Sequence, residues 1–377
     1  MNKVLLGDVA VEHKETCKGS KDGYPIVGLE HLIPEEITLT AWDEGSENTF
    51  SKMFRKGNVL FGRRRAYLKK AAVAPFDGIC SGDITVIEAK PDRILPELLP
   101  FIIQNDDLFD FAVGKSAGSL SPRVKWEHLK NYEFELPDME KQKELAELLW
   151  AMDNTKKSYQ KLIVATDELV KSQFMEQFGS YLGDETRCAT VEQVCTVFAD
   201  GDWIESKDQA DDGIRLIQTG NVGNGVYLDK GERARYIDEE TFVRLNCTEV
   251  LPNDILISRL PDPVGRACII PDGLGKSITA VDCSIVRLKS HVLPEFFVAY
   301  TMTTLYAAQI GSSVTGSTRK RISRKNLGQV VIPTPDIDQQ EQFAAFVRQS
   351  DKSKFELEKA LSELTATYKR IIAENLG

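Results

Sequence analysis

The sequence has little of several patterns that mark common protein classes. Among its 377 residues are four histidines and seven cysteines, and no two cysteines form a C-x-x-C pair. This pattern argues against structural zinc and against a disulfide framework, so we expect buried free thiols. No apolar run approaches the roughly eighteen residues that a membrane helix needs, and the apolar stretch in "MNKVLLGDVA" is too short for a signal peptide. The expected compartment is therefore the cytoplasm, with no membrane partner.

Motifs of common catalytic classes are also missing. The chain has no H-E-x-x-H and no Asn/Asp-Pro-Pro-aromatic motif of amino-methyltransferases, and its GKS triplets at 114–116 and 275–277 lack the first glycine of a phosphate loop. The stretch "GDITVIEAK" offers Asp83, Glu88 and Lys90, a set found in metal-dependent nucleases. Residues five apart on one strand point to opposite faces, however. We therefore expect a non-catalytic chain with no metal or cofactor of its own.

Acidic residues are missing from two long windows, although the formal net charge is −10. The first lies between Glu47 and Asp77 and contains "FGRRRAYLKKAA" (61–72). The second runs from Phe296 to Pro335 and contains "STRKRISRK" (317–325). Cations are thus concentrated locally in a chain that is acidic overall.

The chain is an internal duplication. "LPDMEKQKELAELLWAMDN", starting at Leu136, returns as "TPDIDQQEQFAAFVRQSDK" from Thr334, an offset of 198 residues. The same offset relates "LPELLPFII" (95–103) to "LPEFFVAYT" (293–301). Shifts of one or two residues also align "GDITVIE" with "DCSIVRL". Each half therefore has one plan, a mixed segment followed by a long helical segment.

Short apolar, β-branched runs predict the strands of the mixed segments. They are "NVLFG", "ITVIEA", "DILIS" and "CSIVRL", bounded by Gly, Pro and Asp. The apolar stretches 98–111 and 296–310 predict one helix of ten or more residues each. Each globular part should be an α/β mixture around its own sheet.

The segments 139–178 and 336–376 predict two long helices, because neither contains Pro or Gly. Apolar or neutral residues recur mostly every three or four positions. The first series is Leu145, Leu148, Met152, Thr155, Tyr159, Leu162, Thr166 and Leu169, and the second is Phe343, Val347, Ser350, Leu357, Leu361, Leu364, Tyr368 and Ile371. This period is typical of a coiled coil. We expect the Leu145 series to face the Phe343 series in an antiparallel pair, with the globular parts at opposite ends. The alternative is that each helix packs on its own domain.

Two basic windows, one in each half of a duplicated chain, favour nucleic-acid binding, because cations displace counterions from phosphates. Phe54, Phe61, Tyr67 and Phe76 flank the first window as apolar backing. The alternative for each window is an ordinary solvated face, in which some arginines brace the fold through carboxylates elsewhere.

The runs "GNVLFGRRRAYLKKAAVAPFDGICSGDITVIEAK" and "KSAGSLSPRVKWEHLKNYEFELPDMEKQKELAELL" resemble the target recognition domain and the following helix of Type I restriction-modification specificity subunits. In the second half, "NDILISR", "TGSTRKRISRKNL" and "IPTPDIDQQEQFA" resemble the same signatures. The second copy departs from the first at "RLPDPVGRAC", so the phosphate contacts expected of 63–70 are not transferred there beyond Arg259 and Arg266.

The resemblance implies an α+β chain with target recognition domains at 1–137 and 180–334 and spacer helices at 138–179 and 335–377. It also implies binding of double-stranded DNA, two methyltransferase subunits and, in the full complex, restriction (motor-nuclease) subunits. S-adenosylmethionine, ATP and Mg²⁺ would belong to those partners. The predicted DNA-contacting residues are Arg63, Arg64, Arg65, Tyr67, Lys69, Lys70, Ser119, Arg123, Lys125, Arg259, Ser317, Arg319, Lys320 and Arg321. Two rival functions are a protein-interaction scaffold that does not bind DNA, and a recognition domain fused to a nuclease or methyltransferase.

Overall fold

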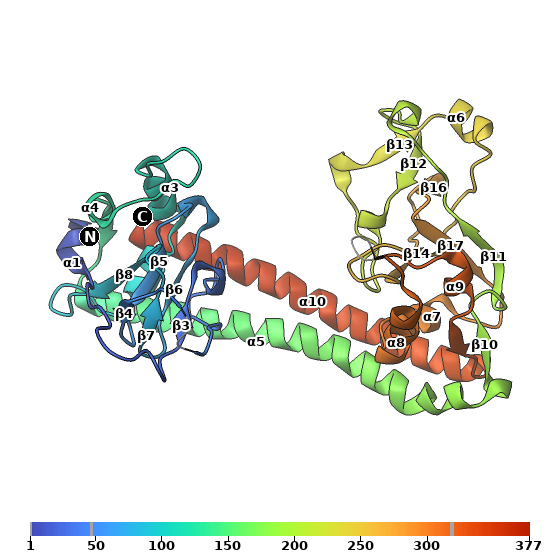
Figure 1. The fold of residues 1–377 in the computed structure, drawn as a ribbon, viewed down its shortest axis with the longest axis horizontal. Helices are drawn as coiled ribbons and strands as arrows, with labels where there is room; N and C mark the ends of the chain where they lie inside the picture. Colours follow the sequence, from blue (N-terminus) through green and yellow to red (C-terminus); the bar gives the residue numbers. More distant parts are fainter. Residues whose placement is uncertain (1, 46–47, 317–319) are drawn as a thin grey trace. The chain divides into compact units, whose positions relative to one another are not determined.

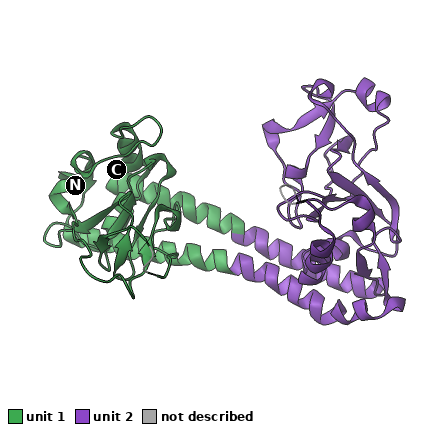
Figure 2. Cartoon of the chain, viewed as in Figure 1, with its two compact units in different colours: residues 1–161, 358–377 green, residues 162–357 purple. Residues whose placement is uncertain are grey.

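The computed structural model describes residues 2–45, 48–316 and 320–377. These residues form two compact units, unit 1 (1–161 with 358–377) and unit 2 (162–357), coloured separately in Figure 2. Two helices of 40 residues, α5 (Met139–Phe178) and α10 (Ile337–Leu376), each contribute to both units. The long helices are thus confirmed, with bounds within one residue of those predicted.

Unit 1 is built around a four-stranded antiparallel sheet in the order β2-β8-β5-β6. Figure 1 labels β8, β5 and β6 of this sheet. A three-stranded sheet (β3-β7-β4) and the pair β1-β9 complete it, and β3 runs parallel to β7. The strands are β1 (Asn2–Leu5), β2 (Ala10–Glu12), β3 (Ile26–Val27), β4 (Lys52–Phe54), β5 (Val59–Gly62), β6 (Ala71–Val73), β7 (Gly78–Cys80), β8 (Ile84–Ala89) and β9 (Glu133–Leu136). The short α-helices are α1 (Leu6–Val9), α2 (Leu99–Ile103), α3 (Asp106–Gly114) and α4 (Trp126–Leu129).

Unit 2 repeats this plan with the sheet β11-β17-β14-β15 and the pair β10-β18. Its three-stranded sheet has the order β13-β12-β16. The outer strand β13 pairs with β12, the first strand of the parallel pair, whereas β4 of unit 1 pairs with β7, the second strand of its parallel pair. The strands are β10 (Cys188–Thr190), β11 (Cys195–Asp200), β12 (Ile214–Ile217), β13 (Arg235–Ile237), β14 (Ile255–Ser258), β15 (Ala267–Ile269), β16 (Ser277–Thr279), β17 (Cys283–Leu288) and β18 (Val331–Pro333). The short α-helices are α6 (Glu239–Arg244), α7 (Pro294–Thr301), α8 (Thr304–Ser313) and α9 (Arg324–Gly328). The predicted strands "ITVIEA" and "CSIVRL" are β8 and β17, residue for residue.

The prediction of one helix after each "LPE" is wrong, because two short helices lie in each place. Asn105 separates α2 from α3, and its side chain accepts a hydrogen bond from the Asp107 N–H. Thr303 separates α7 from α8, and its hydroxyl accepts one from the Tyr306 N–H. Both are N-cap residues, which satisfy a free N–H only where the preceding backbone leaves the helix. Each therefore starts a new helix inside an apolar run.

The long helices run antiparallel within unit 2, as predicted. Asp167 of α5 pairs with Lys354 of α10 at 2.8 Å. Farther along, the Tyr181 hydroxyl donates to Gln339 Oε1 at 3.3 Å. The rings of Phe174, Phe296 and Phe343, with centroids 5.1–6.1 Å apart, join α5, α7 and α10 in one core. In unit 1, Phe101 of α2 contacts both Trp150 of α5 and Tyr368 of α10.

The predicted phase of α5 is wrong in part. Leu148, Leu162 and Leu169 of the Leu145 series are about half exposed, whereas Leu149 and Val170 are buried. The globular cores set the phase, because Leu149 packs in the unit 1 core and Val170 in the unit 2 core. Both helices therefore also pack on the globular parts, as the alternative expected.

All seven cysteines are free thiols. Cys80, Cys247, Cys268 and Cys283 are buried, and burial raises the pKa of Cys80 and of Cys268 to about 12. These four thiols confirm the expectation, and the other three are partly buried. Among the described residues, none of the helices combines the length and the apolar character needed to cross a membrane.

Candidate nucleic-acid interface

A short loop of the same construction lies in each unit. In unit 1, Ala117 and Arg123 exchange two backbone hydrogen bonds of 3.0 and 2.9 Å. In unit 2, Thr315 and Arg321 exchange two bonds of 2.9 Å. Loop 1 (117–123) and loop 2 (315–321) are thus closed in the same way, although residues 317–319 lie outside the described part of loop 2. Leu120 of loop 1 is 90% exposed.

Backbone hydrogen bonds hold each loop beside the end of an inner strand of its sheet, β5 in unit 1 and β14 in unit 2. After β5, the Arg63 N–H donates to the Asp83 carbonyl (3.0 Å), and the Arg63 carbonyl accepts from the Val124 N–H (3.0 Å). After β14, Arg259 makes the same two bonds with Asp282 and Ile322, at 2.9 and 3.2 Å. Because these bonds join equivalent backbone positions, each loop lies beside the equivalent strand end of its unit.

An aspartate lies beside the arginine of each loop. Arg123 Nε donates to Asp83 Oδ1 at 2.7 Å, and Nη2 donates to Oδ2 at 3.3 Å. Arg64 Nη1 lies 3.4 Å from the same carboxylate, and Arg64 Nε and Nη2 donate to the Ser121 hydroxyl. The hydrogen bonds from Arg123 hold the pKa of Asp83 below its usual value, and Asp83 raises the pKa of Arg123. In unit 2, Arg321 Nη2 lies 3.3 Å from Asp282 Oδ1.

Two other predicted cations of unit 1 have internal contacts, and a third is partly buried. Lys69 Nζ lies 2.6 Å from Asp106, and Lys70 Nζ donates to the Leu29 carbonyl at 2.7 Å. Arg63 is partly buried, and its Nε has no hydrogen-bond partner among the described residues. Lys69 and Lys70 fit the alternative in which basic residues brace the fold.

The remaining predicted residues of unit 1 face solvent. Arg65, Ser119 and Lys125 are exposed, and Tyr67 is 54% exposed. Arg65 lies in the left-handed region (φ 55°), and its N–H donates to Pro122 in loop 1 at 2.8 Å. The structure thus brings Arg65 and loop 1 together.

In unit 2, Lys320 and Arg321 are exposed, and the predicted contacts Ser317 and Arg319 lie outside the described residues. Arg259 is only 4% exposed, pairs with Asp200 at 3.3 Å and donates to the Val281 carbonyl. Burial lowers the pKa of Arg259. As placed, it braces the sheet rather than facing solvent.

A model of the Type I restriction modification DNA specificity domain matches residues 3–164 and 186–365. The chain belongs to the family of Type I restriction-modification specificity subunits. The putative MjaX specificity subunit of Methanocaldococcus jannaschii is 20% identical over 93% of this chain and 87% of its own length. The EcoDI specificity subunit of Escherichia coli is 25% identical over 48% of this chain and 37% of its own length.

Two solved structures share the fold. A chain from a study of complex assembly and conformational transition of the type I R-M system has a TM-score of 0.63 and 20% identity, with 99% of this chain and 97% of that chain covered. The type I S subunit from M. genitalium has a TM-score of 0.54 and 12% identity, with 98% and 94% covered. The chain is thus a DNA specificity subunit with two target recognition domains.

This specificity subunit belongs to a non-catalytic family, and the nuclease-like set of residues is dispersed. Asp83 pairs with Arg123, Glu88 pairs with His13 at 2.8 Å, and Lys90 donates to the Gly7 carbonyl at 2.7 Å. Each member has a different partner, so the three do not converge on one site.

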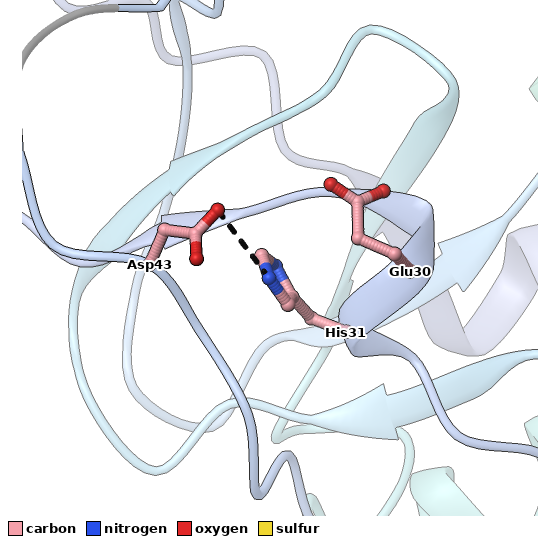
Figure 3. Close-up of side chains that lie close together, drawn as sticks. All are labelled: Glu30, His31 and Asp43. Atoms are coloured by element: carbon pink, nitrogen blue, oxygen red, sulfur yellow. Dashed lines mark ion pairs between the residues drawn. The ribbon is translucent and has the colours of Figure 1, made fainter. Parts of the chain in front are cut away.

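Glu30, His31 and Asp43 of the specificity subunit also lie close together (Figure 3). His31 Nδ1 accepts a hydrogen bond from the Gly28 N–H at 3.0 Å, so the ring proton lies on Nε2, 3.6 Å from Asp43 Oδ2. A protonated nitrogen has no lone pair for a metal. In this arrangement the imidazole cannot act as a ligand, and the two carboxylates are exposed.

The carboxylates beside the loop arginines were not predicted from the sequence. Asp83 and Asp282 lie just before equivalent strands, in the aligned stretches "GDITVIE" and "DCSIVRL". An acid retained just before the same strand in both copies was the available signal.

Proposed function

We propose that this specificity subunit reads an asymmetric, bipartite DNA target, one globular domain per half-site. The observation that supports this best is the repeated loop, closed by the same backbone bonds and attached to the same strand end in each unit. The frameworks are alike, but the sequences "GSLSPR" and "GSTRKR" differ. Different side chains on equal frameworks present different donors to base edges, so the two half-sites would differ.

In the proposed interface, the exposed cations contact phosphates and the loop arginines contact base edges. Arg65, Lys125 and Lys320 are exposed and supply the phosphate contacts. Arg64, Arg123 and Arg321 lie beside the two aspartates and supply donors in the planar geometry that base edges accept. Tyr67, Ser119, Ser317 and Arg319 complete the predicted set. Arg63, Lys69, Lys70 and Arg259 stay predicted contacts, and the internal role of Lys70 is tested below.

We also propose that the chain holds two methyltransferase subunits and, in the full complex, the restriction subunits. Apolar side chains on the long helices of unit 2 support a partner surface, because Leu162, Val164, Leu169 and Phe355 are about half exposed or more. The similar solved chain comes from a study of assembly of a type I R-M system, which agrees with this role.

A domain exchange tests the reading of half-sites. Residues 1–137 are replaced by the corresponding segment of a family member with a different target, and the hybrid is produced with its methyltransferase subunits. Single-molecule sequencing of host DNA then gives the methylated motif. We expect one half-site to change while the other half-site and the spacing stay the same. A change in both half-sites, or a motif without a spacer, would contradict the proposal.

A gel shift with and without methyltransferase subunits tests the rival function, a protein-interaction scaffold. Retention of duplex DNA by the complex but not by the methyltransferase alone supports the specificity role. A complex that assembles and retains no DNA supports the scaffold instead.

A further inference from the structure

The carboxylate beside each loop arginine is unexpected on a DNA-binding surface. A negative charge repels phosphates, so Asp83 and Asp282 lower the affinity for DNA unless they do something else. The same acid nevertheless recurs beside the same loop arginine in both units. Its benefit must therefore lie in something other than net charge.

The geometry of Arg123 on Asp83 shows what that benefit is. The carboxylate binds the side-on edge of the guanidinium, using Nε and Nη2, and leaves Nη1 out of both bonds. A guanidinium has five N–H donors, so the end-on edge formed by Nη1 and the second proton of Nη2 stays available. Two parallel donors match O6 and N7 of guanine in the major groove.

A guanidinium held on one edge also loses rotational freedom before it meets DNA. Less conformational entropy is then lost on binding. A free arginine could instead turn toward the nearest phosphate, which carries no sequence information. Holding the side chain thus converts a general cation into a directed donor pair.

We propose that Asp83 is a positioning residue for base reading, which holds Arg123 side-on so that its end-on edge donates to a guanine. Asp282, whose Oδ1 lies 3.3 Å from Arg321 Nη2, is the corresponding positioning residue in the second half-site. This inference rests on the proposed function, since it requires loop 1 to enter a groove.

The test uses the complete complex with methyltransferase subunits, carrying Asp83→Asn or Asp83→Ala. The probe is a random-sequence duplex library, methylated in vitro and sequenced to give the motif, followed by binding to the recovered motif and to random duplex. We expect the complex to accept more than one base at a single position of one half-site. The ratio of specific to random affinity should fall about 5- to 150-fold. Binding to random duplex should stay unchanged or rise, because a negative charge is removed.

The matched control is Asp77→Asn, which removes the same charge from unit 1 at a side chain that pairs with Arg55, 2.8 Å away. The control should leave the motif unchanged. A double variant, Arg123→Ala with Asp83→Ala, should lose no more specificity than Arg123→Ala alone, because the aspartate acts through the arginine.

Three results would overturn the inference. Equal losses on specific and random DNA, together with a lower Tm for Asp83→Asn, would make Asp83 a structural brace. If Arg123→Ala leaves the motif unchanged, Arg123 does not read a base and the inference fails. A bipartite wild-type motif would still support the proposed function. A wild-type complex without any sequence preference would reject both.

Discussion

Gln142 of α5 accepts a hydrogen bond at 2.9 Å from the backbone N–H of Leu95, just before α2. Its amide nitrogen donates to the Pro137 carbonyl at 2.9 Å. In unit 2, Gln340 accepts from the Leu293 N–H at 2.9 Å and donates to the Pro335 carbonyl at 2.8 Å. Both glutamines are almost fully buried, so the duplication extends to a polar contact that fixes each long helix to its domain.

Gln142→Leu should lower the free energy of unfolding by about 2–6 kcal/mol, because one buried and one partly buried backbone group lose their partners at about 1–3 kcal/mol each. Gln340→Leu should have a similar effect through unit 2. Gln177→Leu, an exposed position on α5, is the control. Urea unfolding followed by tryptophan fluorescence measures the change, and equal stability of Gln142→Leu and the control would contradict the role.

Gly78→Ala should destabilise unit 1 by about 1–3 kcal/mol, as overpacked cores do. A Cβ at Gly78 would meet the ring of the buried Phe54 and lie 2.7 Å from the Pro25 carbonyl oxygen. Gly82→Ala is the control, because no atom lies within 4 Å of its added Cβ. Thermal unfolding should show a lower Tm for Gly78→Ala alone.

The Asp83–Arg123 pair should make stability depend on pH at the acid end. Arg123 and Arg64 hold the folded pKa of Asp83 below its ordinary value of 3.8. The stabilisation is therefore fully present above the unfolded pKa and is lost as pH falls through the folded pKa. Both arginines are more than a third exposed, so the effect should be about 0.5–1 kcal/mol.

Urea unfolding of the wild type and of Asp83→Asn, from pH 7 down to pH 2, checks this prediction. The difference between them should be constant near neutral pH and shrink toward the acid end. Asp92→Asn, at an exposed carboxylate, controls for the general effect of lost charge. A difference that grows as the pH falls would show that the sign is wrong.

Replacing Arg65, Lys125 and Lys320 by Gln should weaken binding to all DNA sequences alike. Each lost phosphate contact should reduce the slope of log affinity against log salt by roughly 0.9. Lys70→Gln should leave the slope unchanged, because Lys70 Nζ already donates to the Leu29 carbonyl. Titrations at several salt concentrations measure both, and an unchanged slope in the triple variant would exclude these phosphate contacts.

Shortening both long helices equally should shorten the DNA spacer. Continuing the register of Asp167 with Lys354 pairs 158–164 with 357–363, so these two heptads are deleted together. Seven residues correspond to about 10 Å of helix, or about three base pairs at about 3.4 Å each. Half-sites should be unchanged, and selection from a library with randomised spacers measures the new length. Recovery of the original spacer by a complex that still binds would show that something else sets it.

The sequence by itself determined the duplication, the long helices and the main strands. Their signals are local or repeated: the shared offset of 198 residues, the lack of Pro and Gly in 139–178, and the β-branched runs at β8 and β17. The signatures of both halves also indicated the family, which the match to residues 3–164 and 186–365 bears out.

Only the tertiary structure decided how these parts use their side chains. Periodicity predicted that Leu148 and Leu169 face inward, but the globular cores bury Leu149 and Val170 instead. Charge alone did not separate the exposed Arg65 from the buried Arg259, because both are arginines near a strand end in a basic or polar stretch. The approach of Asp83 to Arg123, forty residues apart in the sequence, exists only once the sheet places the loop beside β8. Such contacts depend on where the fold brings distant segments together, which local pattern does not encode.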